Sequence, residues 1–162
     1  MADVTISQLN NISPNSSAII PISQNGSTYS TTLQQLSALP FIPKAWVNFD
    51  GSRDFSGASS TSNTNRFIKG SYNISSVLRN AKGDYTITFA SQLPESNYAI
   101  SGFSVGYTGS NVTGAAMVTL FPSGAGTYQP FLKSTSQVRI SVGDPGAGTT
   151  YDSGNISIII FG

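Results

Sequence analysis

The sequence predicts an all-β protein, an antiparallel β-sandwich or small barrel that follows a short N-terminal hairpin-plus-helix arm. Beyond residue 43, apolar residues alternate with polar ones at the period of two that half-buried strands require. These runs are short and are separated by glycine-containing turns, as in sandwiches and small barrels. No apolar period of 3.6 residues follows Leu39, so helices are not expected there.

Residues 1–42 are predicted to form the arm. Asn25-Gly26 is the dipeptide of a tight hairpin turn, with an extended run on either side. Thr31 or Thr32 can cap a brief helix, which Pro40 ends. The arm has too few large apolar residues to hold a fold alone, so we expect it to dock on a partner. The residues predicted to make this attachment are Ile6, Leu9, Ile20, Ile22, Leu33, Leu36 and Leu39.

Residues 43–162 are predicted to form the β domain. The expected strands are 45–49, 66–72, 74–78, 84–90, 98–107, 115–121, 137–142 and 155–161. The clearest signal lies in the runs that begin at Tyr85 and Tyr98, which a turn-prone segment containing Pro94 connects. We predict that these two runs pair as antiparallel neighbours. The aromatic residues expected to pack in the core are Trp46, Phe49, Tyr72, Tyr85, Phe89, Tyr98, Phe103 and Phe121.

The composition argues against catalysis and against metal or cofactor binding. Only 9% of the residues are charged, the net charge is +1, and the chain contains neither histidine nor cysteine. The commonest general base and the thiolate metal ligands are therefore missing. The nearest carboxylates, Asp50 and Asp54, flank Arg53 and favour a turn with a local ion pair. We expect no enzyme activity, no cofactor, no metal, and no nucleic-acid or membrane partner. Without a signal peptide or a membrane-spanning run, a soluble protein made in a cytoplasm is expected.

Four aromatic residues lie in or beside loops rich in Gly, Ser and Thr. Such rings can stack on sugar rings, fill a subunit interface or pack against the domain's own end, and the sequence leaves these alternatives open. The predicted loop-tip receptor contacts are Tyr107, Tyr128, Phe131 and Tyr151.

Two parts of the chain resemble bacteriophage virion proteins. The run Ala45-Trp46-Val47-Asn48-Phe49-Asp50-Gly51, with residues 68–77, 83–89 and 93–99, resembles a module of tail fibres and related virion-surface proteins, including those of cyanophages. Residues 4–9 and 20–32 resemble the arm with which many phage fibres and tailspikes begin. The order of the two parts is the one expected in such proteins.

The resemblance implies a non-enzymatic virion structural protein. It would be a short fibre, homotrimeric as such proteins often are, made in the host cytoplasm and placed on the virion surface. Its arm would bind a tail, baseplate or major capsid protein, and its β domain would contact the host surface, including a surface glycan. A trimer would also bury apolar sheet edges. The short connector between arm and domain leaves an alternative, a capsid decoration protein (cement or head spike) that stabilises the shell.

Overall fold

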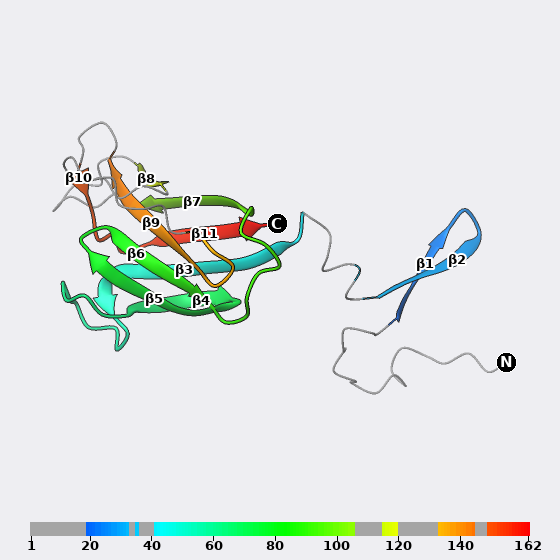
Figure 1. Ribbon diagram of the computed structural model, residues 1–162, viewed down its shortest axis with the longest axis horizontal. Helices are drawn as coiled ribbons and strands as arrows, with labels where there is room; N and C mark the ends of the chain where they lie inside the picture. Colours follow the sequence, from blue (N-terminus) through cyan, green and yellow to red (C-terminus); the bar gives the residue numbers. More distant parts are fainter. Residues whose placement is uncertain (1–18, 33–34, 36–40, 106–114, 120–132, 145–148) are drawn as a thin grey trace. The chain divides into compact units, whose positions relative to one another are not determined.

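The computed structural model describes residues 19–32, 35, 41–105, 115–119, 133–144 and 149–162. The chain divides into two compact units, Met1–Ile42 and Pro43–Gly162. Within the described residues both units are built from antiparallel strands, and the single residue Gln35 is the only one with helical conformation (Figure 1). The predicted all-β class is therefore confirmed.

The first unit contains a two-stranded hairpin of β1 (Ile19–Gln24) and β2 (Ser27–Thr32). Asn25 and Gly26 form its turn with φ of 52° and 77°, the left-handed values that a two-residue hairpin loop needs. After β2, the Thr32 hydroxyl accepts a hydrogen bond from the Gln35 amide, and the Gln35 side chain accepts one from the Thr32 amide. This reciprocal pair is a helix-capping box at the predicted position. The predicted helix itself falls mainly on residues outside the described ranges.

The second unit is one nine-stranded sheet. Eight strands follow one another in the order β4-β3-β11-β7-β8-β9-β6-β5, and the ninth strand, β10, pairs with β9 outside this order. All pairs in the sheet are antiparallel. The strands are β3 (Pro43–Asp54), β4 (Arg66–Tyr72), β5 (Ile74–Ala81), β6 (Asp84–Phe89), β7 (Ala99–Val105), β8 (Ala115–Thr119), β9 (Gln137–Asp144), β10 (Thr149–Thr150) and β11 (Ile156–Phe161). Each strand predicted from the sequence is present: β4 has the predicted bounds, the other strands differ at one or both ends, and the predicted ends at 107 and 121 lie outside the described residues.

The sheet curls until its two ends meet. Strands β4, β3, β11 and β7 form one layer, which β9, β6 and β5 cross to form the other (Figure 1). The terminal strands β4 and β5 are joined by Asn73 alone, at a φ of 55°. An isolated bridge between Asn65 and Leu78 also links the two ends. The result is a curled half-barrel whose layers pack like a β-sandwich.

The core lies between the two layers and follows the period of the strands. Alternate residues of β3 and β11 meet alternate residues of β5, β6 and β9, and each of these side chains is buried. The rings of Phe49 and Tyr85 pack edge to face at 5.1 Å between centroids. The buried apolar residues of the strands are Ala45, Val47, Phe49, Val77, Tyr85, Ile87, Phe89, Val138, Ile140, Val142, Ile156, Ile158 and Ile160.

The predicted pairing between the runs at Tyr85 and Tyr98 is wrong. Strand β6 pairs with β5 and β9, whereas β7 pairs with β11 and β8. The connection does not turn back, because its own residues enter the core: Leu93 is buried and its amide donates to the Thr135 carbonyl. Tyr98 is buried as well, with its ring 5.8 Å from that of Phe89. The segment therefore crosses from one layer to the other.

The core assignment is wrong for three of the predicted aromatic residues. Trp46, Tyr72 and Phe103 expose 40%, 58% and 59% of their surface. Trp46 stands between Ala45 and Val47, which are both buried, so strand alternation turns it outward. Phe121 lies outside the described residues.

Candidate functional site

The outward surface of β3, β11 and β7 carries a groove of about 460 Å³. Strand register places Trp46, Ile159 and Ser101 in one row, and Asn48, Ser157 and Phe103 in the next. We call these six residues and the space between them the outer-face groove. Trp46 and Phe103 stand at opposite corners, two strand spacings or about 10 Å apart across the sheet. Among the described residues, no charged side chain lines the groove.

The Trp46 indole lies over a glycine of the neighbouring strand. A β-carbon added at Gly70, on the neighbouring strand β4, would stand 3.5 Å from two atoms of the six-membered ring. The ring therefore lies over the Gly70 backbone, a contact that favours this orientation of the indole. A preformed aromatic wall costs less ordering entropy on binding than a mobile one.

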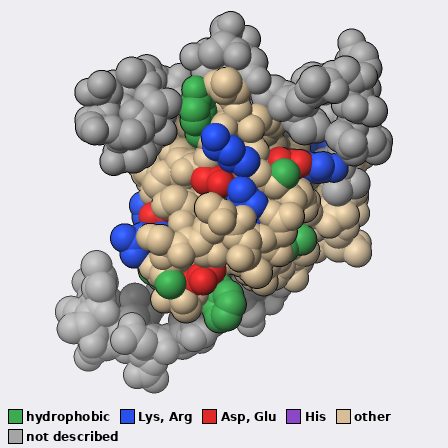
Figure 2. All heavy atoms as spheres, turned by 90° about the vertical axis from the view of Figure 1, so that its left-hand side faces the viewer, with side chains coloured by type: hydrophobic (Ala, Val, Ile, Leu, Met, Phe, Trp, Pro, Cys, Tyr) green, Lys and Arg blue, Asp and Glu red, His purple; other side chains and the backbone are tan. Residues whose placement is uncertain are grey.

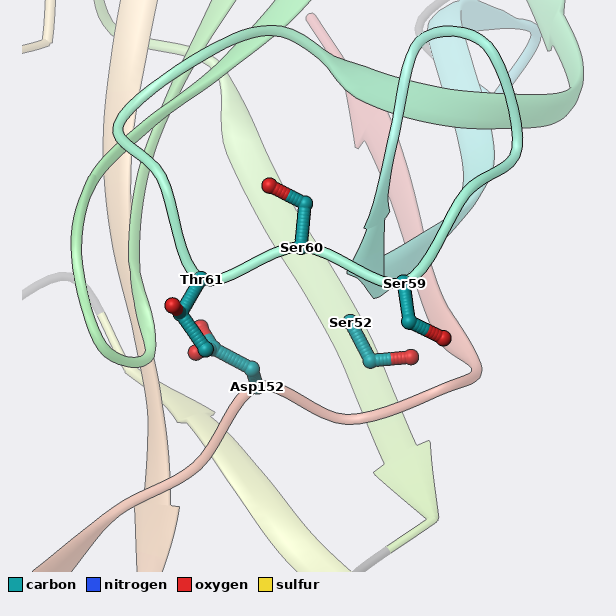
Figure 3. A pocket seen from close by; sticks show the side chains of 5 residues that line it. All are labelled: Ser52, Ser59, Ser60, Thr61 and Asp152. Atoms are coloured by element: carbon teal, nitrogen blue, oxygen red, sulfur yellow. The ribbon is translucent and has the colours of Figure 1, made fainter.

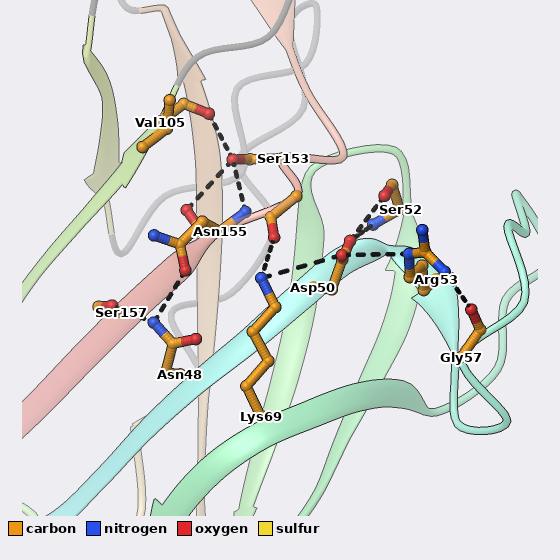
Figure 4. A network of polar contacts seen from close by, with 11 residues as sticks. Asn48, Asp50, Ser52, Arg53, Gly57, Lys69, Val105, Ser153, Asn155 and Ser157 are labelled. Atoms are coloured by element: carbon orange, nitrogen blue, oxygen red, sulfur yellow. Dashed lines mark hydrogen bonds and ion pairs between the residues drawn. The ribbon is translucent and has the colours of Figure 1, made fainter.

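The lining of the groove is mostly apolar, and the polar side chains of Asn48 and Ser157 are held in place by hydrogen bonds. Asn48 Nδ2 donates to Asn155 Oδ1 at 2.9 Å and to Ser157 Oγ at 2.6 Å (Figure 4). Both amide protons are therefore used, while Asn48 Oδ1 keeps its acceptor capacity and the Ser157 hydroxyl keeps its proton. Neither has a further partner among the described residues. Ser153 is buried, donates to the Val105 carbonyl and accepts from the Asn155 amide, so it fixes the backbone of the residue that accepts from Asn48.

A second cavity, of about 330 Å³, is lined by hydroxyl groups and one carboxylate. Its residues are Ser52, Ser59, Ser60, Thr61 and Asp152 (Figure 3). The carboxylate of Asp152 is occupied by the protein: it accepts from Arg79 at 2.9 Å, from the Gly83 amide at 3.0 Å and from the Tyr85 hydroxyl at 2.7 Å. Burial works to raise the pKa of Asp152, but these bonds outweigh it and the pKa is lowered. A carboxylate that stays ionised and neutralised by Arg79 is a poor general acid and a poor metal ligand.

The two carboxylates nearest in sequence, Asp50 and Asp54, bond to residues close to them in the chain. Asp50 accepts from the Ser52 amide and hydroxyl, and Arg53 Nε lies 3.5 Å from it (Figure 4). Asp54 accepts from the Ser56 hydroxyl and amide, and this bonding lowers its pKa. In the described part of the chain, no group of three or more possible metal-ligating side chains gathers. Asp50 lies within β3, where the pairing with β4 shifts register, and Asp54 ends that strand before the turn at residues 55 and 56. The predicted local ion pair between Asp50 and Arg53 is present, but the predicted turn begins only after Asp54.

Of the predicted receptor contacts, the structure describes only Tyr151. Its hydroxyl lies 2.6 Å from Thr149 Oγ1, and Lys82 Nζ stands 5.7 Å from its ring centroid. Tyr151 is half-buried against its own domain, one of the alternatives left open. Tyr107, Tyr128 and Phe131 lie outside the described residues.

Of the predicted attachment residues, Ile20 lies half-buried in β1, and Ile22 is in β1 with its side chain outside the description. Ile19, which the prediction left out, exposes 69% of its surface. Tyr29 on β2 exposes 57%. The remaining predicted attachment residues, Ile6, Leu9, Leu33, Leu36 and Leu39, lie outside the described residues.

The end of the β unit that bears the 52–65 loop is mostly uncharged. In Figure 2 its surface is largely backbone and side chains without charge, and the acidic and basic side chains near its centre stand next to one another. Within the described ranges, no helix has the length and hydropathy needed to cross a membrane. No protein-family model, curated protein or solved structure matches this chain.

Proposed function

We propose that the protein is a non-enzymatic structural protein of a bacteriophage virion. It is a short homotrimeric fibre, anchored by its N-terminal arm to a tail, baseplate or capsid protein, and its β unit contacts the host surface. The observation that carries this proposal is the unequal build of the two units, with a thin arm joined to a well-packed curled sheet.

The arm has the properties of a segment that needs a partner. A lone two-stranded hairpin is at best marginally stable in water. In β1 and β2, Ile19 and Tyr29 are exposed, and none of the hairpin side chains that the structure describes is fully buried. Burial of one large apolar side chain is worth about 1.5–3 kcal/mol, so covering several of them contributes strongly to the binding free energy between the arm and its partner. The open edges of β1 and β2 also offer backbone groups for strand addition.

The β unit has the properties of a durable scaffold. Two of its buried charged side chains form ion pairs within the unit. Arg79 pairs with Asp152, and Asp84 pairs with Arg139 through two hydrogen bonds. Buried Arg66 donates to the carbonyls of Ser60 and Ser62, and so fixes the long loop between β3 and β4. A bidentate Arg–carboxylate pair gives geometric stability rather than reactivity.

The experiment that tests the proposal is the localisation of the protein in purified particles of the phage that encodes it. Immunogold labelling combined with cryo-electron microscopy is expected to find the protein on the tail or baseplate, as a fibre. Label on the capsid shell instead would favour the decoration alternative. Absence of the protein from purified particles would contradict both functions.

A further inference from the structure

We propose that the outer-face groove is a binding site for a neutral saccharide, with Trp46 and Phe103 as its walls and Asn48 and Ser157 as its floor. The inference rests on the proposed function, because it names the chemical class that the β unit contacts at a host surface. It assigns that contact to a sheet face and not to the predicted loop tips.

The two aromatic walls suit a sugar ring. A pyranose presents C–H groups on its flat faces, and these carry slight positive charge, whereas the face of an aromatic ring is negative. Trp46 and Phe103 keep 40% and 59% of their surface exposed, so both rings are accessible. A volume of about 460 Å³ falls within the range of ligand pockets and can hold a mono- or disaccharide.

The floor suits hydroxyl groups. A sugar hydroxyl both donates and accepts, and the groove offers one group of each kind in a fixed position. Asn48 Oδ1 can accept, because both protons of Asn48 Nδ2 are already donated. The Ser157 hydroxyl can donate, because its bond from Asn48 uses one of its two lone pairs and leaves its proton. The Ser101 side chain is exposed at the rim and can do either.

The same geometry argues against other occupants. No lysine or arginine lines the groove within the described residues, so an anionic ligand would lose its hydration without a counter-charge. An apolar surface, such as the same face of a second copy, would cover Asn48 Oδ1 and the Ser157 hydroxyl and leave both unpaired in a dry contact. Unsatisfied buried polar groups are expensive. A neutral polyol pairs with both.

Trp46 makes the proposal directly measurable, because it is the chain's only tryptophan. We would titrate the full-length protein with neutral disaccharides of glucose, galactose, mannose, rhamnose and N-acetylglucosamine up to about 20 mM, since weak sites bind in the millimolar range. Trp46 emission and its quenching by acrylamide are the readouts. We expect at least one sugar to shift the emission and to protect Trp46 from the quencher. Binding should not change with salt, because no charge takes part.

The variants separate the groove from the rest of the surface. Phe103→Ala removes an exposed wall and should weaken binding by tenfold or more. Phe55→Ala removes an even more exposed ring (72%) from the turn after β3, outside the groove, and should leave binding unchanged. Asn48→Ala, with its melting temperature checked, should also weaken binding. If Asn48→Ala does not fold, Phe103→Ala still decides, because its ring lies outside the core.

Three results would overturn the inference. The first is that Trp46 responds to none of the sugars, and the second is that Phe103→Ala binds sugar as well as the wild type does. The third is that Trp46 is already shielded from acrylamide in the absence of sugar, while Phe103→Ala changes the sedimentation coefficient of the protein. The last result would identify the groove as a contact between copies. The proposed function is tested separately, by the presence of the protein on purified particles. The saccharide site and the virion function can therefore be contradicted independently.

Discussion

At the scale of single residues, Asp152 ties together parts of the chain that are far apart in sequence. Its carboxylate accepts hydrogen bonds from β5 through Arg79, from the turn before β6 through Gly83, and from the core through Tyr85. Arg79 also donates to Asn63 in the loop between β3 and β4. Arg79 is buried, so it depends on this one carboxylate for its charge balance among the described residues.

Asp152→Asn is expected to lower the free energy of unfolding by about 3 kcal/mol, because it leaves the Arg79 guanidinium buried without a counter-ion. We place the loss at the lower end of the usual range since the Asp152 side chain keeps 14% of its surface exposed. Urea denaturation at pH 7 measures it. The exposed Glu95→Gln is the matched control and should not move the midpoint. An equal effect of both substitutions would show that Asp152 has no special role.

The stability should also depend on pH through Asp152. The pKa of its carboxyl is lower in the folded protein than the value of about 3.9 in an unfolded chain. The carboxylate therefore stabilises the fold fully above that value, and this contribution is lost as the pH falls through the folded pKa. The difference in free energy of unfolding between the wild type and Asp152→Asn should shrink when the pH is lowered from about 5 to 2. A constant difference would contradict the assignment.

The sequence could indicate only part of this residue-scale picture. The local bonding of Asp50 and Asp54 was recognisable, because their partners follow within a few positions. That β3 continues as far as Asp54 was not. The bonding of Asp152 was not recognisable either, because Arg79 and Tyr85 approach it only after the sheet has curled. The outward position of Trp46 was within reach of the sequence: three alternate residues of β3 are apolar and buried, which forces the intervening tryptophan outward.

At the scale of elements, the hairpin of β5 and β6 is closed by a glycine that packs against two other segments. Gly83 has a φ of 66°, and a β-carbon there would stand 2.5 Å from the Val142 carbonyl oxygen and 2.7 Å from the Tyr151 amide. Both atoms belong to backbone, which cannot move aside easily. The turn therefore needs glycine both for its conformation and for its close contacts.

Gly83→Ala is expected to lower the free energy of unfolding by at least about 2 kcal/mol, because strain at positive φ adds to overpacking. Gly57→Ala is the control for conformation alone. Its φ is 86°, but the nearest atoms, in the Phe67 ring, are 3.8 Å away, so we expect a loss of only about 1 kcal/mol. Thermal and urea unfolding of the two variants measure the difference. Equal losses would show that packing at Gly83 contributes nothing.

The elements themselves were predictable, but their pairing was not. Alternation fixes which runs are strands, since it reflects a local property of the pleated backbone. Which strands become hydrogen-bonded neighbours depends on the path of the segments that connect them. The segment from β6 to β7 looked like a turn because of Pro94, yet buried Leu93 and Tyr98 draw it across the core. No local pattern distinguishes such a crossing from a hairpin loop.

At the scale of the molecule, we propose that a thin arm and a stable β unit assemble as a fibre of three copies. Sheet edges and exposed apolar side chains favour association in the β unit, where Tyr72 on the terminal strand β4 exposes 58% of its surface. Three-fold closure would give each edge the same neighbour.

Multi-angle light scattering of the purified full-length chain at micromolar concentration is expected to give a mass three times that of the 17.0 kDa monomer. The elution position should not shift on moderate dilution, because a fibre subunit must stay assembled outside the cell. A stable monomer under these conditions would contradict the trimer.

The most direct test of the division of labour is a deletion of residues 1–39, followed by two readouts on the same variant. The account predicts that the shortened protein keeps the melting temperature and β-sheet circular dichroism of the full-length chain, because the core residues lie in Pro43–Gly162. It also predicts that the variant is absent from purified phage particles, because the anchor is gone. A shortened chain that unfolds or aggregates, or one that is still incorporated into particles, would contradict this central claim.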